Sequence, residues 1–552
     1  MTIERTFSLD RRTFIGSGAT AAAGLALGGL PLKVLGQDRR LATIGGTAQT
    51  TSGSVRGLLR DGIQQFWCVP YGAPTAGTNR FMPPRKPVAW TGVKDHFEIT
   101  FAAPLAPDAE EPAPVVTALN RKTPQSEDCL TVNVFTPGLD NRARPVMVWL
   151  HGGGFSAGSG NYLLYDGTNL AKKEDVVVVA VNHRLNIFGF LHLADLGGDA
   201  WAGATNAGIQ DLVAALQWVH ENIESFGGDP DRVTIFGQSG GGGKTTTLMA
   251  MPSAEGLFHR SIAQSGSAFR GQTASDATDG AERFLAKLGL NKSRLDELHR
   301  LPTRAIQAAY YSEPRIERLG NGPVIDGIIL PRDQWDPTAP SYSANVAFMA
   351  GSTETENGWV GPPPYELSEA DMLERFTTRL AGNDAAEGQK LVALYERLYP
   401  NMRNQMLWLT AESDDTRRFA AQELCRLKQE QDGAPAYLYF FDWHSPVHNN
   451  RMGSYHTLDI PFVLYNMDLG ASMTGAAQER YELAHVMSAA WAAFARTGDP
   501  NHADLPSWPA FSAVYPTMIL GNECRVVNDP NKEERLALKA MRDAAVTTTA
   551  AR

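Results

Sequence analysis

Cysteine is scarce in this chain, with four residues in 552: Cys68, Cys129, Cys425 and Cys524. None of them has the short spacing of a metal-binding motif, so we expect no metal and no cofactor. Four cysteines are few for this length, although an even number permits one or two disulfides in an exported protein. The sequence alone does not pair them.

An excess of positive charge is also absent. The chain has 50 Lys and Arg against 60 Asp and Glu, which gives a formal net charge of -10. This balance argues against nucleic acid or an anionic membrane surface as a partner. With 43% hydrophobic and 20% charged residues, the composition is that of an ordinary globular protein.

The one long apolar run that stands out lies at the N-terminus. Arg11 and Arg12 precede a Gly/Ala-rich run from about Phe14 to Leu32, which is typical of a twin-arginine export signal. The run is short and weakly hydrophobic for a membrane span, so we expect no stable membrane anchor. We predict that residues 1–36 are the signal and that residues 37–552 form one catalytic domain, exported to the periplasm or beyond.

Downstream of this run, strand patterns alternate with helical ones. Continuous apolar runs such as Pro145–Leu150 and Val176–Val181 are typical of strands covered on both faces, whereas Asp211–Asn222 has apolar residues at helical spacing. This alternation predicts an α/β fold with a mostly parallel, doubly wound sheet flanked by helices. We expect further strands or helices near residues 40–70, 126–135, 233–236, 258–265, 277–310, 346–350, 365–430, 437–441 and 478–496.

A glycine-rich segment, residues 237–241, follows the apolar run Val233–Phe236 and reads Gly-Gln-Ser-Gly-Gly. This is the G-x-S-x-G arrangement of a nucleophile elbow, in which a strained turn exposes the hydroxyl of Ser239. Glycines on either side let the neighbouring backbones pass closely. Taken alone, the motif is also compatible with a flexible surface loop, because G-x-S-x-G often occurs by chance.

The same glycines are followed by Lys244 and Thr245, which invites comparison with a phosphate-binding loop. Counted back from Lys244, the first required glycine position falls on Gln238, and Gly237 is one residue too early. The spacing therefore predicts no phosphate site.

A serine nucleophile also needs preplaced donors for the oxyanion. The run His151-Gly152-Gly153-Gly154 ends an apolar strand pattern upstream of the elbow, where such a run usually supplies these donors. We expect the backbone N–H groups of Gly153, Gly154 and Gly240 to form the oxyanion hole. A tight turn would explain the glycines alone, but the combination with the elbow, in this order, favours the functional interpretation.

The acid and the base are expected to follow the serine along the chain. Of the 12 histidines, His456 is favoured because it lies in a loop after the strand pattern 437–441. Asp326, Glu354 and Glu356 all lie near strand ends, and spacing does not choose among them.

Several runs of the chain resemble the type-B carboxylesterases, the α/β-hydrolase group that also contains cholinesterases and bacterial nitrobenzyl esterases. The resemblance extends over roughly residues 40–520 and implies an α/β-hydrolase fold with helical insertions that form the substrate cleft. The matching runs are 126–130, 151–155, 222–241, 264–267, 323–327 and 456–462.

The resemblance implies Ser239 as nucleophile, His456 as base and Glu356 as acid. Residues 351–356 match the family's Gly-Thr-x-x-(Asp)-Glu pattern with Glu356 in the acid position, and Glu354 remains as a rival two places earlier. Ser265 would lie near this triad as a further hydroxyl.

The resemblance also bears on buried pairs. It implies a structural ion pair between Glu127 and Arg184. The cysteine that usually pairs with Cys129 is absent from residues 101–114, so Cys129 is either free or joined to Cys68. We also suggest a bridge between Cys425 and Cys524.

Three positions depart from the family pattern: Gln238 replaces a glutamate, Gly240 an alanine and Asn357 a glycine. A carboxylate beside His456 would favour the protonated imidazole, and an amide would not. We hypothesise that the acidic limb of the rate profile lies lower than it would with glutamate at position 238.

The predicted function is serine-dependent hydrolysis of small-molecule carboxylic esters through an acyl-enzyme. A carbamate or amide hydrolase on the same triad is the main alternative. A catalytically silent binding member of the fold is disfavoured, because such members typically lose the serine or the histidine. The substrate is left open, since Phe155, Tyr162, Phe269, Trp359 and Trp408 either line a gorge or belong to the core.

Overall fold

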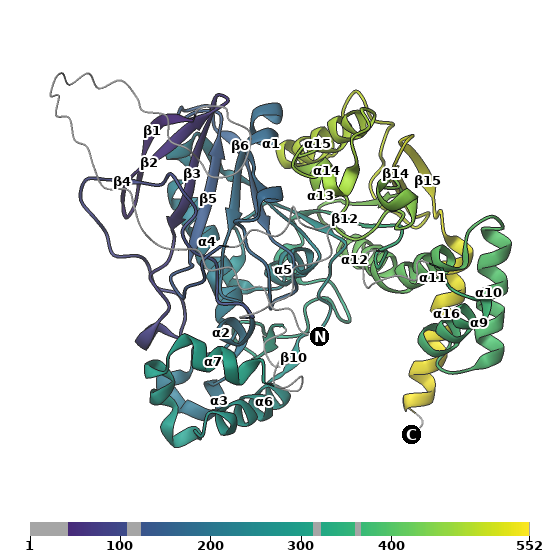
Figure 1. Cartoon of the computed structure of the whole chain (residues 1–552), viewed down its shortest axis with the longest axis horizontal. Helices are drawn as coiled ribbons and strands as arrows, with labels where there is room; N and C mark the ends of the chain where they lie inside the picture. The colour runs from purple at the N-terminus through teal and green to yellow at the C-terminus, as the bar shows by residue number, and fades with distance from the viewer. Residues whose placement is uncertain (1–41, 107–122, 313–321, 359–365, 551–552) are drawn as a thin grey trace, which may run out of the picture.

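The structure is a computed structural model that describes residues 42–106, 123–312, 322–358 and 366–550 (Figure 1). The predicted export signal, residues 1–36, lies outside the described residues, as does Trp359. Within the described ranges, no helix is both long enough and apolar enough to cross a membrane.

One large sheet forms the frame of the molecule, in the order β1-β2-β3-β5-β7-β6-β8-β9-β12-β13-β14-β15. The pairs from β7 through β14 are parallel, and the pairs outside them, from β1 to β7 and from β14 to β15, are antiparallel. The mostly parallel sheet predicted from the sequence is therefore confirmed. Its strands are β1 (Thr43–Thr50), β2 (Gly53–Arg60), β3 (Ile63–Pro70), β5 (Thr131–Thr136), β6 (Arg144–Leu150), β7 (Val177–Val181), β8 (Gly228–Gln238), β9 (Arg260–Gln264), β12 (Ala347–Thr353), β13 (Ala436–Phe441), β14 (Pro516–Leu520) and β15 (Arg525–Asn528), with the short β4 (Val93–Asp95) beside β2.

Helices cover both faces of this sheet because its strands are apolar on both sides. In β6, Val146 and Val148 belong to one core cluster, and Met147 and Trp149 to the other. The first cluster is closed by α4 (Ala207–Asn222), α5 (Gly240–Leu248) and α12 (Phe419–Gln429), and the second by α1 (Thr168–Glu174), α13 (Ile460–Val463) and α15 (Arg480–Thr497). This is the doubly wound arrangement.

Two helical lobes extend from the sheet (Figure 1). The lower lobe has its own small core around Phe284 and Trp201, and the right-hand lobe packs around Tyr395 and Trp408, where Leu538 of the C-terminal helix joins it. Their elements are α2 (Asn186–Phe190), α3 (Ala194–Gly197), α6 (Ala274–Lys287), η7 (Lys292–Arg300) and α7 (Thr303–Tyr310) in the first, and α9 (Glu369–Arg375), η9 (Phe376–Leu380), α10 (Ala385–Leu398), α11 (Asn404–Ser413) and α16 (Lys532–Ala550) in the second.

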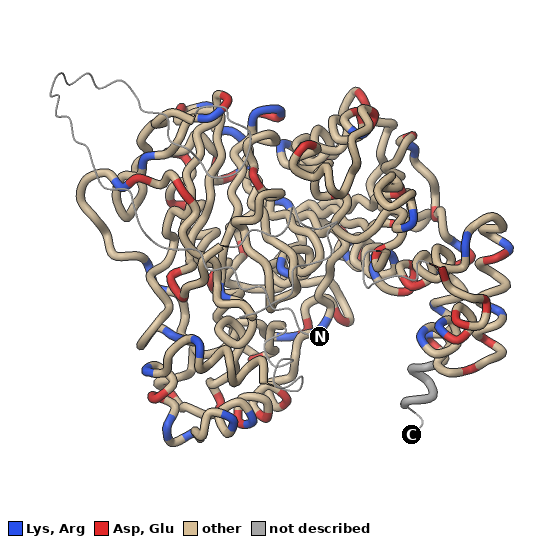
Figure 2. Tube along the Cα trace, viewed as in Figure 1, with Lys and Arg blue, Asp and Glu red and all other residues tan. Residues whose placement is uncertain are grey.

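Acidic and basic residues are interspersed along the Cα trace in Figure 2, on the sheet edges and on both lobes. The net negative charge is therefore not gathered in one region of this view.

The predicted ion pair between Glu127 and Arg184 is wrong. Arg80 pairs with Glu127, with Nη2–Oε1 at 2.6 Å, and Arg184 pairs with Asp211, with Nη2–Oδ1 at 2.6 Å. All four side chains are at least 95% buried. Each arginine meets a carboxylate from another part of the chain, which local spacing does not reveal.

The suggested Cys425–Cys524 disulfide is wrong as well, because all four cysteines are free thiols. Cys425 belongs to the core cluster on one face of the sheet, and Cys524 packs against the cluster on the other. Of the two alternatives for Cys129, the free thiol is the one observed, and burial raises its pKa well above the usual range.

Candidate active site

The G-x-S-x-G segment forms a sharp turn between β8 and α5. Ser239 has φ 58° and ψ -123°, a conformation that is strained for a residue with a side chain. A Cβ on Gly237 or Gly241 would lie 2.4 Å or 2.0 Å from the carbonyl oxygen of Leu150, so only glycine fits there. These close approaches fix Ser239 at the carboxyl edge of the sheet, partly exposed.

The glycine loop after β6 lies beside this turn. Gly153 and Gly154 have φ of 91° and 62°, which favours glycine at both positions. A Cβ on Gly152 would lie 3.4 Å from Cβ of Ser239, and one on Gly240 would lie 2.4 Å from the backbone nitrogen of Gly154. The three candidate oxyanion glycines are thus brought together with the serine.

His456 and Glu356 form a buried pair. Glu356 lies just after β12, and His456 lies in the segment that follows β13. Nδ1 of His456 hydrogen-bonds to Oε2 of Glu356, and the backbone N–H of His456 donates to the carbonyl of Glu356 at 3.0 Å. The other carboxylate oxygen, Oε1, accepts from the backbone N–H of Thr353 at 2.9 Å. The backbone N–H of Glu356 donates to Oγ of Ser413, in α11, at 2.8 Å.

The rival acids lie elsewhere. Glu354 hydrogen-bonds to His444. Asp326 accepts from the backbone N–H groups of three following residues, 328–330, which places it in a turn. Of the three acidic candidates, Glu356 is the one that hydrogen-bonds to the imidazole of His456.

The electrostatics of Glu356 suit a carboxylate that stays ionised. Burial on its own would raise the pKa of Glu356, but His456, through its charge and its hydrogen bond, and more distantly Arg417, hold that pKa below its usual value. Ser265 lies near enough to contribute in the same direction. Its hydroxyl does not reach hydrogen-bond geometry, so we regard it as an electrostatic neighbour of the carboxylate.

Gln238, the residue before the serine, contacts the same imidazole. Its Nε2 lies 3.1 Å from Nε2 and 3.2 Å from Nδ1 of His456, and its side chain is buried. His456 is therefore in contact with the residue that precedes Ser239, although 218 positions separate Gln238 and His456 in sequence.

Asp459 lies within the run 456–462 and is fully buried near Glu356 and His456. Its Oδ2 accepts from Nε2 of Gln264 at 2.8 Å and from the hydroxyl of Tyr439 at 3.3 Å. Burial, reinforced by the charge of Glu356, raises the pKa of Asp459 to about 6 against the opposing effects of Gln264, His456 and Tyr439. The position of Asp459, three residues after the predicted base His456, was the sequence feature that could have indicated its place in the site.

Lys244 and Ser413 were also missed as parts of the site. Lys244, which follows the glycines compared above with a phosphate-binding loop, is fully buried in α5 and donates from Nζ to the carbonyl of His151 at 2.8 Å. A lysine inside a short Gly/Thr-rich helix was the signal for it. No sequence feature indicated Ser413, because its partner Glu356 is 57 residues away in the chain.

The aromatic candidates for a gorge divide by environment. Trp408 packs against Phe376 in the right-hand lobe, and Tyr162 packs against Tyr165 beside the second core cluster. Phe155 directly follows the glycine loop and contacts Phe190. Phe155 is therefore the aromatic residue nearest in sequence to the candidate oxyanion donors.

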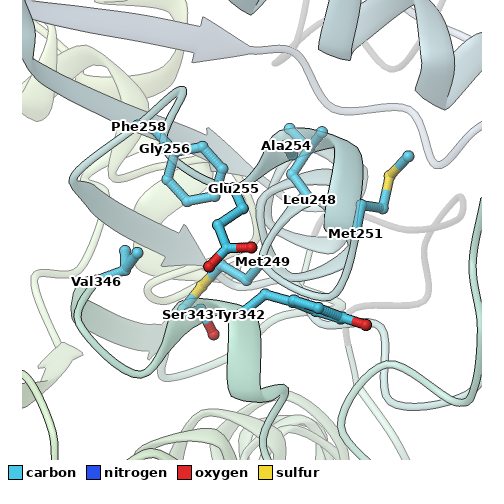
Figure 3. A pocket seen from close by; sticks show the side chains of 10 residues that line it. All are labelled: Leu248, Met249, Met251, Ala254, Glu255, Gly256, Phe258, Tyr342, Ser343 and Val346. Atoms are coloured by element: carbon cyan, nitrogen blue, oxygen red, sulfur yellow. The ribbon is translucent and has the colours of Figure 1, made fainter.

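An apolar pocket lies at the other end of α5, away from Ser239 (Figure 3). None of the predicted site residues lines it. Among the described residues, no group of three or more His, Cys, Asp or Glu side chains is arranged to hold a metal ion. The pocket is lined by Leu248, Met249, Met251, Ala254, Glu255, Gly256, Phe258, Tyr342, Ser343 and Val346.

Comparison with known proteins gives consistent relatives. A family model described as "Carboxylesterase family" matches residues 45–538. A para-nitrobenzyl esterase of Bacillus subtilis (strain 168) is 35% identical over 500 residues, covering 89% of this chain and 97% of its own. A phenmedipham hydrolase of Pseudarthrobacter oxydans is 30% identical, covering 90% and 99%.

Solved structures agree with these relatives. An esterase of Clostridium hathewayi, described as able to hydrolyse aliphatic aromatic polyesters, is 34% identical with a TM-score of 0.78, covering 90% of this chain and 98% of its own. A thermophilic pNB esterase is 34% identical with a TM-score of 0.76, covering 89% and 99%. The fold is thus that of these esterases, and the chain belongs to the carboxylesterase family.

Proposed function

We propose that this carboxylesterase cleaves carboxylic esters with a Ser239-His456-Glu356 triad through an acyl-enzyme. The observation that carries the proposal is the buried Glu356–His456 pair, whose imidazole also contacts Gln238, the residue before the strained serine. A nucleophile, a base and a group that orients the base are the minimum for this chemistry.

In the proposed acylation, Oγ of Ser239 attacks the ester carbonyl carbon while Nε2 of His456 takes the hydroxyl proton. Glu356 keeps the proton of Nδ1 in place and stabilises the imidazolium. The N–H groups of Gly153, Gly154 and Gly240 donate to the carbonyl oxygen as it becomes negative. The tetrahedral intermediate then expels the alcohol, which takes the proton from His456.

Deacylation reverses the roles with water. His456 removes a proton from a water molecule, which attacks the acyl carbon and releases the carboxylic acid, and Ser239 recovers its proton. No metal or cofactor takes part in either step. The residues named supply the nucleophile, the base and the oxyanion donors.

A carbamate or amide hydrolase on the same residues is the alternative, because the triad does not depend on the leaving atom. The silent binding member is disfavoured, since the serine, histidine and glutamate are all present and the acid and base are paired. A panel of p-nitrophenyl esters of increasing chain length, run beside the matching anilides and carbamates, discriminates these classes.

Ser239→Ala is the control variant in that panel. We expect ester cleavage to exceed anilide cleavage by orders of magnitude and to fall by about 10³-fold or more in Ser239→Ala. Full ester hydrolysis by this variant would overturn the proposal.

We also propose export through the twin-arginine signal at residues 1–36. The proposal rests on the sequence pattern of Arg11, Arg12 and the run that follows them. Fractionation of a bacterial host tests it: the double variant Arg11→Lys, Arg12→Lys is expected to accumulate in the cytoplasm. Unchanged export of that variant would contradict the signal assignment.

A further inference from the structure

Lys244 is a buried cation without a carboxylate partner among the described residues. The side chain is inaccessible to solvent, and its Nζ donates to the backbone carbonyl of His151 at 2.8 Å. The ring of Phe155 lies 5.8 Å from the same atom. Burial lowers the pKa of Lys244 to about 7, which is a measure of how unfavourable this environment is for an ammonium group.

The neighbouring titratable groups do not compensate for this cation. His151 and His183 stack on each other with ring centroids 5.1 Å apart. Burial, together with the charge of Lys244, holds the pKa of both imidazoles well below the usual range, so they remain neutral. An apolar side chain at position 244 would avoid the free-energy cost of burying an ammonium group. The position of Lys244 between α5 and the glycine loop suggests why a lysine is found there.

The threonine hydroxyls of α5 all bond within their own helix, and that of Thr246 also accepts from the backbone N–H of Ala268 at 3.0 Å. The hydroxyls of Thr245, Thr246 and Thr247 donate to carbonyls of residues 242 and 243. Lys244 differs in that its side chain donates to His151, the first residue of the glycine loop. The helix that Ser239 caps is thus joined directly to the loop that carries Gly153 and Gly154.

The glycine loop is the part of the site that most needs such an anchor. Three consecutive glycines, residues 152–154, have more conformational freedom to lose than any other sequence of this length. The loop must nevertheless hold its N–H groups at the position of the oxyanion, because displacement by about 1 Å can cost on the order of 10²-fold in rate.

We propose that Lys244 is a positioning residue for ester hydrolysis, which holds the oxyanion loop against the nucleophile through the carbonyl of His151. The inference rests on the function proposed above, in which that loop binds the oxyanion. Lys244 touches neither substrate nor reacting atoms in this scheme. Its loss would therefore weaken transition-state binding more than substrate binding.

Replacement by methionine tests the inference, because Lys244→Met keeps the length of the side chain and removes the ammonium donor. We expect kcat for p-nitrophenyl butyrate to fall by about 10- to 100-fold with KM changed by less than about three-fold. A trifluoromethyl ketone that adds to Ser239 and forms a charged hemiketal should lose affinity by a similar factor. A purely structural role would not produce this split.

The chain offers a matched control in Lys428, another fully buried lysine. Its Nζ donates to the carbonyls of Ser343 and Ala344, at 3.1 Å and 2.7 Å, before the first residue of β12 and so at the edge of the sheet opposite Glu356. We expect Lys428→Met to lower the melting temperature but to retain kcat, which separates general destabilisation from loss of loop position.

Lys244→Gln serves as the second variant in case the methionine variant does not fold. Its shorter amide is expected to give the same pattern of lowered kcat and unchanged KM. Wild-type kcat and ketone affinity in either folded Lys244 variant overturn the inference, while an active Ser239→Ala overturns the proposed function instead, so the two failures are distinguishable.

Discussion

Replacing Gln238 with glutamate puts a carboxylate against the imidazole of His456 with almost no change of shape. The amide Nε2 of Gln238 lies 3.1 Å from Nε2 of His456. At that separation two unit charges attract by about 5 kcal/mol for an effective dielectric constant near 20. A carboxylate favours the protonated imidazole, and a protonated imidazole is unable to accept the serine proton.

The net effect is smaller than this Coulomb energy. Position 238 is 1% exposed, so a new carboxylate loses its hydration, and the negatively charged Glu356 shares the same imidazole. Opposite charges in contact typically shift titrations by about 1–3 units, so we expect the acidic limb of kcat/KM to move upward by about 1–2 pH units in Gln238→Glu.

The assay is kcat/KM for p-nitrophenyl butyrate across the acidic and neutral range, with Gln238→Met as the uncharged control. The methionine variant should leave the limb near that of the wild type, since it adds no charge. A limb that stays in place or moves to lower pH in Gln238→Glu would refute the electrostatic reasoning.

Four further outcomes follow from the geometry. Glu356→Gln should lower kcat by about 10³- to 10⁴-fold, whereas Glu354→Gln, which faces His444, should stay within about three-fold of the wild type in steady-state kinetics. The pKa of Asp459 lies near 6 in the folded chain against 3.8 for the ordinary group, so the stability that its proton provides is present below about pH 4 and is lost as pH rises through 6. Urea denaturation should therefore find Asp459→Asn more stable than the wild type by about 1–3 kcal/mol near pH 7, with the difference vanishing near pH 4; a constant difference would contradict this. Asp211→Ala, which leaves the buried Arg184 without its carboxylate, should cost about 3–5 kcal/mol in the same assay, and an unchanged midpoint would argue against that pair. Finally, the unfolded, unreduced protein should titrate four thiols, and only two would indicate a disulfide.

Most strands of the central sheet could be predicted from the sequence because each of them is indicated by a short, local run of apolar residues. Apolar runs give the parallel strands β6, β7 and β13 to within one residue of their observed bounds, since a strand covered on both faces is continuously apolar. The runs at 233–236 and 346–350 identify β8 and β12 but miss residues at the ends of both strands. Strands β14 and β15 and helix α16 went unpredicted, because they follow the last recognised motif and are short or amphipathic.

The order of the candidate site residues along the chain could also be predicted, because turns that require glycine leave a recognisable sequence motif. The contacts of Glu356 could not be predicted from the sequence. The structure distinguishes the three acidic candidates, because it places Glu356 against His456. Long-range choices of partner failed for the same reason: Glu127 selects Arg80, and Arg184 selects Asp211, through tertiary packing. The catalytic roles themselves remain predictions.

Covalent labelling tests the central claim most directly. A fluorophosphonate reacts with an activated serine, and peptide mapping by mass spectrometry then locates the adduct. The account predicts one adduct per chain, on the peptide that contains Ser239, with esterase activity lost in proportion to labelling. Full activity in protein labelled completely at Ser239, or an adduct on another residue that accounts for the loss, would contradict it.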